Sequence, residues 1–576
     1  MTSGVVGPIL RAICLLAVVS HVSVAGAQET IFDPENPSYD DRDEDGGEDA
    51  EEGNDATGGD GLIIDDPERP TTFDEPVDDE PEARSYVPAV FDDTEFSLDY
   101  ELVTLVNPGI GPLGQDRVEF GAGLAMGLRH ELSPQTRAVV SGRFRYWAGA
   151  GRAFDDWRTH YEPRLDRAYL VHRPGRWSFA FGQMRNSWGS TDIIRPGDVI
   201  DPVDMRDPVG GGGFGSALSQ LSATAAYSFS NWSIRALLVP FFQPNQVALF
   251  GRDTALANER NPLIAEQLPF LLLAEQFIEP GAQQYTQPFL LSMSRPKDVP
   301  KNASAGLRAT TTVAGTDLGA GVFYGWDRTP WVVIDEDLRS VLTLIAEDGQ
   351  VFEDYDFFGF VQRNQEVIGH GNNLSEKAEA GETIFESEYL RRATILLDGA
   401  RYVGPIGVRA DLAFSPRRVF YTTEFEAVRR ASVFSALGLS YERLLDGERP
   451  LALTLEGFWL HPFAVDSAIH RALIPQEQGG QEEDELLIFD GGYYGVAGAV
   501  NWHLRWWNLE LSAGGLATIT PGDFVGQLAV ERPWGRGIRT TLGVSLFFGP
   551  DPSEELSAGG LWAHNDRIYF AVGGQF

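Results

Sequence analysis

The chain has 576 residues, a formal net charge of −39 and a single cysteine, Cys14. This negative charge excludes nucleic acid as a partner, because phosphate backbones bind basic surfaces. One thiol can form neither a disulfide framework nor a cysteine-ligated metal site. No stretch of 18 or more apolar residues follows the N-terminal region, so any membrane crossing has to be made by strands rather than helices.

The first 27 residues have the pattern of a signal peptide. Arg11 precedes a short apolar run and Ala25-Gly-Ala27 is typical of a cleavage site, so we expect cleavage before Gln28. Residues 28–94 form the next predicted unit. Within 28–93, 25 acidic residues stand against three basic ones, a net charge of −22. Such a segment buries too little apolar surface to offset its ordering entropy, so we predict a disordered periplasmic segment.

Part of this acidic segment, from Asp41 to Glu52, matches the pattern of a calcium-binding EF-hand loop. However, Glu48 stands where such a loop normally places an apolar residue, and no amphipathic helix flanks it. We therefore interpret this stretch as a solvated, self-repelling linker with diffuse, weak Ca²⁺ association at most. We predict no specific metal site and no cofactor for the chain.

From residue 95 onward, apolar and polar residues alternate with a period of two, which is typical of strands with one lipid face and one wet face. For example, Phe120 and Leu124 share one face of a strand and Glu119 lies on the other. The pattern predicts one domain over 95–576. Its eighteen strands are expected at approximately 95–107, 117–131, 136–148, 161–173, 176–187, 217–229, 232–242, 302–314, 317–327, 386–400, 405–415, 430–444, 451–462, 489–503, 506–519, 523–533, 537–549 and 565–576.

Short and long connections alternate between these strands, as periplasmic turns and outer loops do in a barrel. We therefore predict an all-β fold, a transmembrane antiparallel β-barrel of about eighteen strands, with sixteen as the alternative. An even number places both termini in the periplasm. The last strand ends on Phe576, which suits a closing strand in contact with outer-membrane lipid and recognition by the barrel assembly machinery. The long connections lie near 188–216, 243–301, 328–385 and 463–488.

Several motifs resemble those of a poorly characterised group of porin-like outer-membrane proteins of Gram-negative bacteria. The resemblance spans roughly 95–576 and implies an outer-membrane channel with no catalytic residues to carry over. It rests on a G-Q…W-G-x-x-D…V-I-x-P-x-D pattern and on three further segments, 238–244, 302–308 and 565–576. The residues of the pattern are Phe181-Gly-Gln183, Trp188-Gly189, Asp192, Arg195-Pro196, Val199-Ile-Asp-Pro202 and Asp204.

Charged residues of both signs fall on the predicted lumen faces. In a water-filled pore such residues set a transverse field that selects solutes by charge and size. In a narrow or plugged barrel the same residues pair across the lumen and hold the strands in register. Both interpretations stay open at this point. The candidate lumen residues are Arg137, Arg143, Arg145, Arg164, Asp166, Arg308, Glu388, Arg392, Arg409, Asp411 and Arg539.

The long connection 245–302 is a candidate constriction, because a long loop in a compact barrel is usually functional. A helix capping the barrel surface is the alternative, and 328–385 is a second, more acidic candidate. Enzyme signals are poor, because neither G-x-S-x-G nor H-E-x-x-H occurs. A Ser–His pair from His503 and Ser512 is conceivable on adjacent strands, but we predict that the chain is not an enzyme.

The sequence therefore predicts a monomeric or homotrimeric outer-membrane channel that lets small solutes diffuse passively through a polar lumen narrowed by an inserted outer loop. Two alternatives remain. One is a channel that exports an acidic polysaccharide along an arginine-lined wall. The other is a non-transport barrel that displays its loops or acidic segment to a partner.

Overall fold

The computed structural model describes most of the predicted barrel. The predicted signal peptide, the acidic segment up to residue 93, most of the connection 245–302 and Phe576 lie outside the described residues. Those described are 94–107, 117–149, 158–204, 216–246, 292–293, 296–348, 357–380, 382, 385–421, 427–445, 449–463, 465–466, 484–485, 493–504, 507–520, 522–535, 537–550, 558–563 and 565–575.

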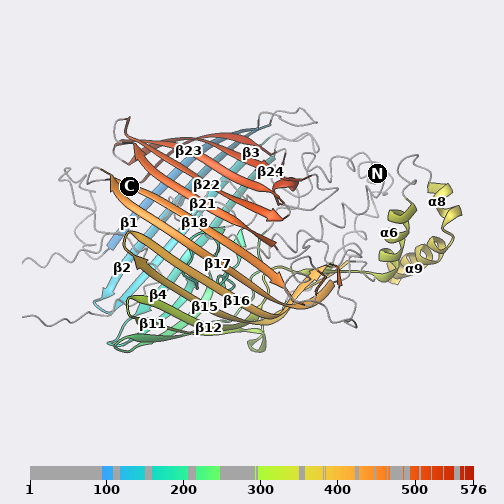
Figure 1. The fold of residues 1–576 in the computed structure, drawn as a ribbon, viewed down its shortest axis with the longest axis horizontal. Helices are drawn as coiled ribbons and strands as arrows, with labels where there is room; N and C mark the ends of the chain where they lie inside the picture. The colour runs from blue at the N-terminus through green and yellow to red at the C-terminus, as the bar shows by residue number, and fades with distance from the viewer. Residues whose placement is uncertain are drawn as a thin grey trace, which may run out of the picture.

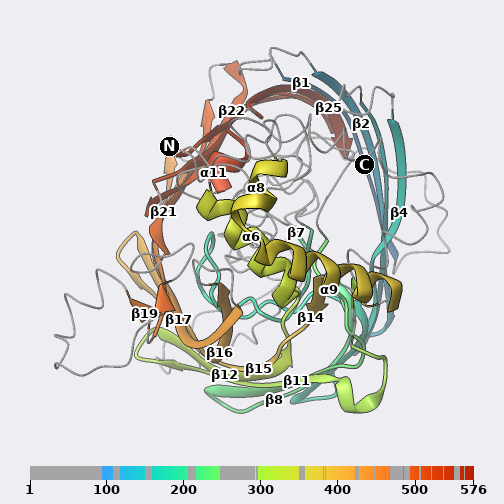
Figure 2. The ribbon, with the colours of Figure 1, turned by 90° about the vertical axis from the view of Figure 1, so that its right-hand side faces the viewer.

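Eighteen strands form one closed antiparallel sheet, which confirms the predicted fold class and strand number. Each strand pairs with its neighbour along the chain, and the last strand pairs with the first, with Asp99 opposite Gln575. Figure 2 shows the resulting ring. The strands are β1 (Thr94–Asn107), β2 (Arg117–Ser133), β3 (Thr136–Gly149), β4 (Arg158–His172), β5 (Trp177–Met184), β8 (Gln220–Ser228), β9 (Trp232–Val239), β11 (Ser304–Val313), β12 (Thr316–Trp326), β15 (Arg391–Val403), β16 (Ile406–Tyr421), β17 (Ala427–Leu445), β18 (Arg449–Pro462), β21 (Tyr493–Leu504), β22 (Leu509–Thr520), β23 (Phe524–Gly535), β24 (Ile538–Phe548) and β25 (Arg567–Gln575).

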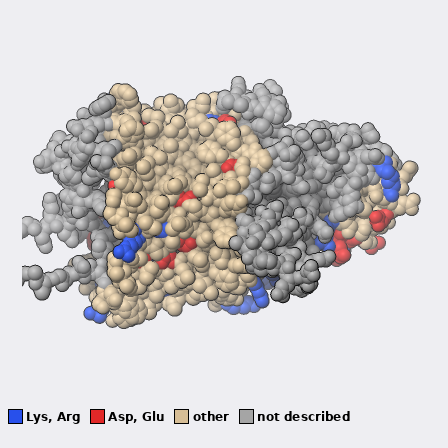
Figure 3. Space-filling view, viewed as in Figure 1, with Lys and Arg blue, Asp and Glu red and all other residues tan. Residues whose placement is uncertain are grey.

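The period-two alternation separates an apolar outer face from an inner face. On β18, Leu453 and Leu455 are 37% and 56% exposed, whereas Glu456 and Phe458 are 1% and 5% exposed. Successive side chains of a strand point to opposite faces, so the exposed leucines lie outside the ring and the buried residues inside it. On the side shown in Figure 3, most of the described barrel flank carries neither acidic nor basic side chains.

The two ends of the barrel differ because short turns and long connections alternate. The start of β1, the end of β25 and the tight turns share one end. In the turn between β11 and β12, both Ala314 and Gly315 have positive φ, as a two-residue hairpin turn with the twist of the flanking strands requires. The long connections gather at the other end, where Figure 1 shows a small module of helices beyond the strands.

This module joins β12 to β15. Its helices are α6 (Glu336–Asp348), α8 (Phe357–Arg363) and α9 (Glu366–Ala380), and β13 (Trp331–Ile334), β14 (Phe385–Glu388) and β10 (Ser292–Met293) form a separate sheet beside them. No helix among the described residues has the length and apolar character needed to cross a membrane. The remaining elements are the pairs β6 (Val203–Asp204) with β7 (Ser216–Ala217) and β19 (Val465–Asp466) with β20 (Asp484–Glu485), the 3₁₀ helix η2 (Pro300–Asn302) and α11 (Ala558–Leu561).

One predicted strand is divided differently in the structure. The sequence predicted a barrel strand over 386–400, with Glu388 facing the lumen. Instead, β15 begins at Arg391, and Glu388 lies on β14, opposite Trp331 of β13 and exposed to solvent. Tyr389 and Leu390 are buried between the two strands. The expectation for Glu388 was wrong because local alternation continues across the boundary between two different sheets.

Candidate functional site

Residues 185–204, between β5 and β8, fold into the barrel; we call them the inserted loop. Ile194 and Ile200 are completely buried, and Trp188 is 2% exposed. They belong to a cluster of buried apolar side chains that extends over the inner faces of the strands from β9 to β22. A hydrophobic core therefore lies inside the ring, between the loop and one arc of the wall. Its wall residues are Leu237, Val239, Phe323, Leu396, Ala413, Phe420, Phe434, Ala436, Phe458, Leu460, Tyr493, Ala497, Ala499 and Leu516.

Trp188 anchors the inserted loop in a socket on β11 and β12. Its indole packs edge-on against Phe323, with ring centroids 6.4 Å apart. The floor of the socket is made of glycines: a Cβ added at Gly306 would lie 2.5 Å from the indole, and one at Gly321 would lie 3.3 Å from it. Two glycines on adjacent strands thus make room for the ring, which accounts for glycine at lumen positions that charged residues occupy elsewhere.

Asp411 of β16 holds the next turn of the inserted loop. Its carboxylate accepts hydrogen bonds from the backbone N–H of Ser190 at 2.7 Å, and from the backbone N–H and hydroxyl of Thr191 at 3.3 and 2.6 Å. Gly189 has a φ of +132°, and a Cβ there would collide with this carboxylate. The position therefore requires glycine both for its backbone conformation and for the close approach of the carboxylate.

Glu456 of β18 holds the following residues in the same way. It is 1% exposed, and its two carboxylate oxygens accept hydrogen bonds from the backbone N–H groups of Asp192 and Ile194, each at 2.6 Å. The side chain of Asp192 forms an ion pair with Arg409. Carboxylates accepting backbone N–H bonds are among the stronger hydrogen bonds in proteins, so two wall carboxylates fix the path of the loop.

A second ion pair supports the same turn of the inserted loop. Arg308 donates to Asp398 at 2.8 Å, and Asp398 also accepts a hydrogen bond from the hydroxyl of Ser190 at 3.1 Å. Three predicted lumen residues, Arg308, Arg409 and Asp411, therefore support the inserted loop. No local pattern indicates this role, because Asp398 and Asp411 lie 208 and 220 positions along the chain from the loop residues that they bind.

The far end of the inserted loop is fastened by Arg328, which follows β12. Its guanidinium is buried and donates to the carbonyl of Ile200 at 2.6 Å and to the side-chain oxygen of Gln220 at 2.8 Å. Gln220 in turn donates to Asp201 at 2.7 Å, and the backbone N–H of Asn186 donates to the same carboxylate. Burial raises the pKa of Asp201 to about 6 and lowers the pKa of Arg328 to about 10.

A second charged group lies on β3 and β4. Arg164 donates to Asp166 at 2.7 Å, and Arg143 lies 3.4 Å from the other oxygen of the same carboxylate. Asp204 of the inserted loop lies 3.4 Å from Arg164 and 4.0 Å from Arg145. The structure thus brings together four of the predicted lumen residues and links them to the loop.

The remaining predicted residues lie apart from this group. Arg137 pairs with Glu131 at 2.5 Å beside the tight turn between β2 and β3. Arg539 of β24 lies 3.9 Å from Glu531 of β23. Arg392 of β15 belongs to the pocket described next.

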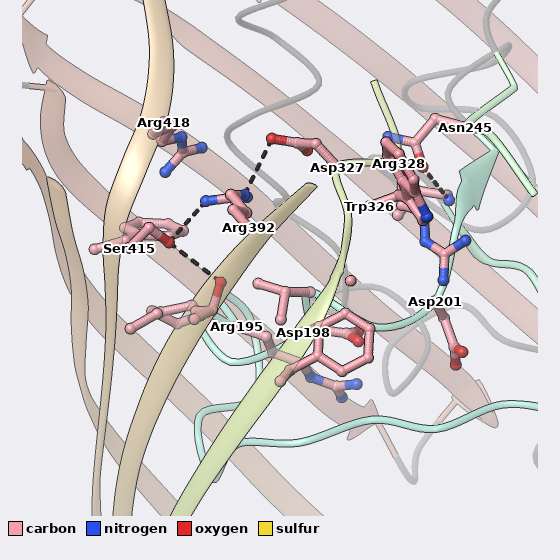
Figure 4. A pocket seen from close by; sticks show the side chains of 18 residues that line it. Arg195, Asp198, Asp201, Asn245, Trp326, Asp327, Arg328, Arg392, Ser415 and Arg418 are labelled. Atoms are coloured by element: carbon pink, nitrogen blue, oxygen red, sulfur yellow. Dashed lines mark hydrogen bonds and ion pairs between the residues drawn. The ribbon is translucent and has the colours of Figure 1, made fainter. Parts of the chain in front are cut away.

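A pocket opens between the inserted loop and the ends of β12, β15 and β16. Four arginines and three aspartates line it; Figure 4 shows Arg392, Arg418 and Asp327 together on one side and Arg328 with Asp201 on the other. Arg392 pairs with Asp327 at 3.1 Å and donates to the hydroxyl of Ser415 at 2.7 Å. The charged lining residues are Arg195, Asp198, Asp201, Asp327, Arg328, Arg392 and Arg418.

Three further points of the sequence analysis concern metal sites, the conceivable Ser–His pair and the candidate constriction. No group of three or more His, Cys, Asp or Glu side chains there is arranged to hold a metal ion. His503 lies opposite Glu510, and Ser512 lies opposite Asn501, so His503 and Ser512 are not cross-strand partners. Most of the candidate constriction 245–302 lies outside the described residues. Among the described residues, the loop that carries the W-G-x-x-D pattern enters the lumen.

Comparison with known proteins finds likeness to solved structures. No family model and no curated protein matches the chain. Acinetobacter baumannii OccAB4 is 6% identical, with 85% of this chain and 100% of that chain covered and a TM-score of 0.40. Pseudomonas aeruginosa OccK5 (OpdH) is 8% identical, with 84% of this chain and 98% of that chain covered and a TM-score of 0.38. Pseudomonas putida OprB is 10% identical, with 84% of this chain and 94% of that chain covered and a TM-score of 0.35. Likeness at this level says nothing about the function of this chain.

Proposed function

We propose that the protein is an outer-membrane channel through which small solutes diffuse passively. The observation that carries this proposal is a closed barrel with an apolar outer face and a charged inner face. Backbone groups in hydrocarbon have to be satisfied within the protein, and a closed sheet does this without a free edge. The exposed leucines of β18 are typical of the outer face, which hydrocarbon would solvate.

The arrangement of the interior supports a path on one side of the barrel. The inserted loop packs on the arc from β9 to β22, where an apolar cluster and the carboxylates of Asp411 and Glu456 hold it. The opposite arc carries charges of both signs on its inner face. There, Glu101 of β1 interacts electrostatically with both Arg539 and Arg145, which lie on either side of it around the ring. We infer that solutes pass along this second arc, between the loop and the charged wall.

The charges on this arc would bias which solutes pass. Arg143 and Arg164 pair with Asp166 of the same wall, and Arg145 and Arg164 lie near Asp204 of the inserted loop, so positive and negative groups lie side by side along this path. Charged groups of both signs on a pore wall discriminate solutes by charge and size. The tight-turn end, with the start of β1 and the end of β25, would face the periplasm, and Phe576 would serve recognition by the assembly machinery. A homotrimer is one arrangement compatible with the exposed apolar flank.

Planar-bilayer recording of the refolded full-length protein tests the proposal. Folding is checked by circular dichroism and by the slower migration of an unheated barrel on a denaturing gel. We expect discrete single-channel currents, and liposome swelling with small sugars that declines as sugar size increases. Absence of current from correctly folded protein would refute a channel and favour the display of loops to a partner.

A further inference from the structure

We propose that the outer wall of the barrel binds the phosphate-bearing headgroup of a lipid at the end with the long connections. Four basic residues form this surface, which we call the basic rim. They are Lys297 and Lys301 before β11, Arg391 at the start of β15 and Arg429 near the start of β17. The inference requires the barrel to lie in a membrane, but it does not require the barrel to conduct, so it can fail independently of the proposed channel.

The two arginines of the basic rim lie on the outer face of the wall. On β15, Ile395 is exposed and Leu396 is buried in the hydrophobic core. Successive side chains alternate between the two faces, so Arg391, four positions from Ile395, faces outward. On β17, Leu437 is exposed, and Arg429 lies eight positions from it on the same face. Both arginines therefore continue the outer face toward the end with the long connections.

Uncharged groups hold these two arginines in place. The guanidinium of Arg391 donates a hydrogen bond to the carbonyl of Lys301 at 2.7 Å. It also lies over the ring of Tyr324, 4.5 Å from the ring centre. The guanidinium of Arg429 lies in the same way 5.0 Å from the ring centre of Trp331. Carbonyl groups and rings carry no net charge, so these contacts fix the guanidinium groups without neutralising them.

The two lysines of the basic rim are exposed to solvent. The side-chain amide of Asn302 donates to the carbonyl of Lys297 at 2.8 Å, which ties Lys297 to the 3₁₀ helix η2 that carries Lys301. Among the described residues, no carboxylate forms an ion pair with any of the four cations of the basic rim. The exposed carboxylates nearest to them in the sequence, Asp298 and Glu388, form none. The charge of the basic rim is therefore open to an anionic ligand.

The position of the basic rim suits a lipid headgroup rather than a soluble anion. On the same outer face, the exposed apolar residues Val322, Ile395 and Leu397 follow it toward the tight-turn end. Cations and aromatic rings beside an apolar band are typical of membrane interfaces. Figure 3 shows basic side chains at the lower right edge of the barrel flank, at the end with the long connections. With the tight-turn end in the periplasm, as proposed above, the lipid belongs to the outer leaflet.

The spacing of the two arginines favours a headgroup with more than one phosphate. β16 separates β15 from β17, so the strands that carry Arg391 and Arg429 lie about 10 Å apart. A disaccharide headgroup with a phosphate at each end is long enough to contact both arginines. Ammonium and guanidinium groups donate charge-assisted hydrogen bonds to phosphate oxygens, and basic surfaces at membrane level bind phosphorylated headgroups in this way.

Native mass spectrometry of the folded, full-length protein in detergent tests the inference. The probes are lipid A with two phosphates, lipid A with one phosphate, phosphatidylcholine, whose headgroup has no net charge, and inorganic phosphate. The critical variant carries Lys297→Gln and Lys301→Gln, because both side chains are exposed and their replacement leaves the contacts of the wall unchanged. We expect the affinity for diphosphorylated lipid A to fall about fivefold for each charge removed, roughly 25-fold in all. Lipid A with one phosphate should bind the wild type more weakly.

The matched control carries Arg176→Gln and Arg401→Gln. Both arginines are exposed beside tight turns at the opposite end of the barrel, and neither has an ion pair among the described residues. The control therefore removes the same charge from the other end of the wall, and it should bind diphosphorylated lipid A as the wild type does.

Each outcome decides for or against the basic rim. Selective loss of lipid A from the lysine variant supports it. Equal affinity of the lysine variant and the wild type, or equal binding of lipid A and phosphatidylcholine, overturns it even when the channel conducts. Binding of inorganic phosphate without binding of lipid A also overturns it, since the surface would then serve a soluble anion. Lipid binding at the basic rim without any bilayer current leaves the inference in place and overturns the channel.

Discussion

Replacing Glu456 by glutamine should loosen the inserted loop without unfolding the barrel. The carboxylate is 1% exposed and accepts two backbone N–H bonds from the loop, each at 2.6 Å. A glutamine side chain of the same shape has one oxygen and one NH₂ group. One loop N–H, that of Asp192 or of Ile194, would then face a donor instead of an acceptor.

The size of the effect follows from the bond that is lost. A hydrogen bond to a charged group contributes about 1.5–3 kcal/mol, and a buried donor left without an acceptor adds to the cost. Since about 1.4 kcal/mol corresponds to a factor of ten, the population of detached loop should rise roughly ten- to hundredfold. A detached loop can enter the path along the charged arc and interrupt the current.

Single-channel recording measures this directly, as the fraction of time spent in interrupted or reduced-conductance states. The matched control is Glu531→Gln, which also removes a lumen carboxylate but lies on β23, where its contacts are with Thr541 and Arg539 rather than with the inserted loop. We expect frequent interruptions in Glu456→Gln and few in the control. Equal behaviour of the two variants would refute the view that the carboxylate bonds hold the loop.

Three further predictions concern the loop, the pocket and the helical module. Trp188→Ala should destabilise the docked loop by about 3–5 kcal/mol, as other truncations of buried aromatic side chains do. The loss should appear as faster proteolysis within 185–204, and unchanged proteolysis would contradict the view that Trp188 anchors the loop. The pKa of Asp201 is about 6, so lowering the pH from 7.5 to 5 should neutralise it and increase anion selectivity in reversal-potential measurements, whereas Asp201→Asn should remove this pH dependence. Lys377 bonds both Asp335 and Asp337, and the pKa of Asp337 lies below the usual carboxyl range while that of Lys377 lies above the usual ammonium range. The contact between α6 and α9 should thus persist from mildly acidic to mildly alkaline pH and weaken as the pH falls below the usual carboxyl pKa. Lys377→Met should raise hydrogen exchange in α9 at neutral pH. Equal exchange in the wild type and in Lys377→Met would argue against a role of these ion pairs in holding α9.

The barrel could be predicted from the sequence because its signal is local. Alternation with a period of two places side chains on two faces of each strand, and the turns between hairpins carry their own residue preferences. The number of strands and most of their spans followed from these features. The prediction failed at Glu388, where alternation continues from β14 towards β15 although the two strands belong to different sheets.

The interior could be predicted less well. The charged residues on β3 and β4 were identified, since alternation places them on the inner face, and the structure joins them to Asp204. The supporting role of Glu456 was missed, because a single buried carboxylate on a strand has no local signal. The pocket was missed as well, because its residues come from a loop and from strands that are far apart in the sequence.

The sequence by itself determined the closed barrel and the two faces of its wall, since the side-chain period of a strand is fixed by its backbone. Which loop enters the lumen was decided only by tertiary structure. The bonds that hold it join Thr191 to Asp411 across 220 residues and Asp192 to Glu456 across 264. Such pairs have no shared period or spacing in the chain, and closure of the sheet is what brings the carboxylates of β16 and β18 up to the backbone of a loop that starts at β5.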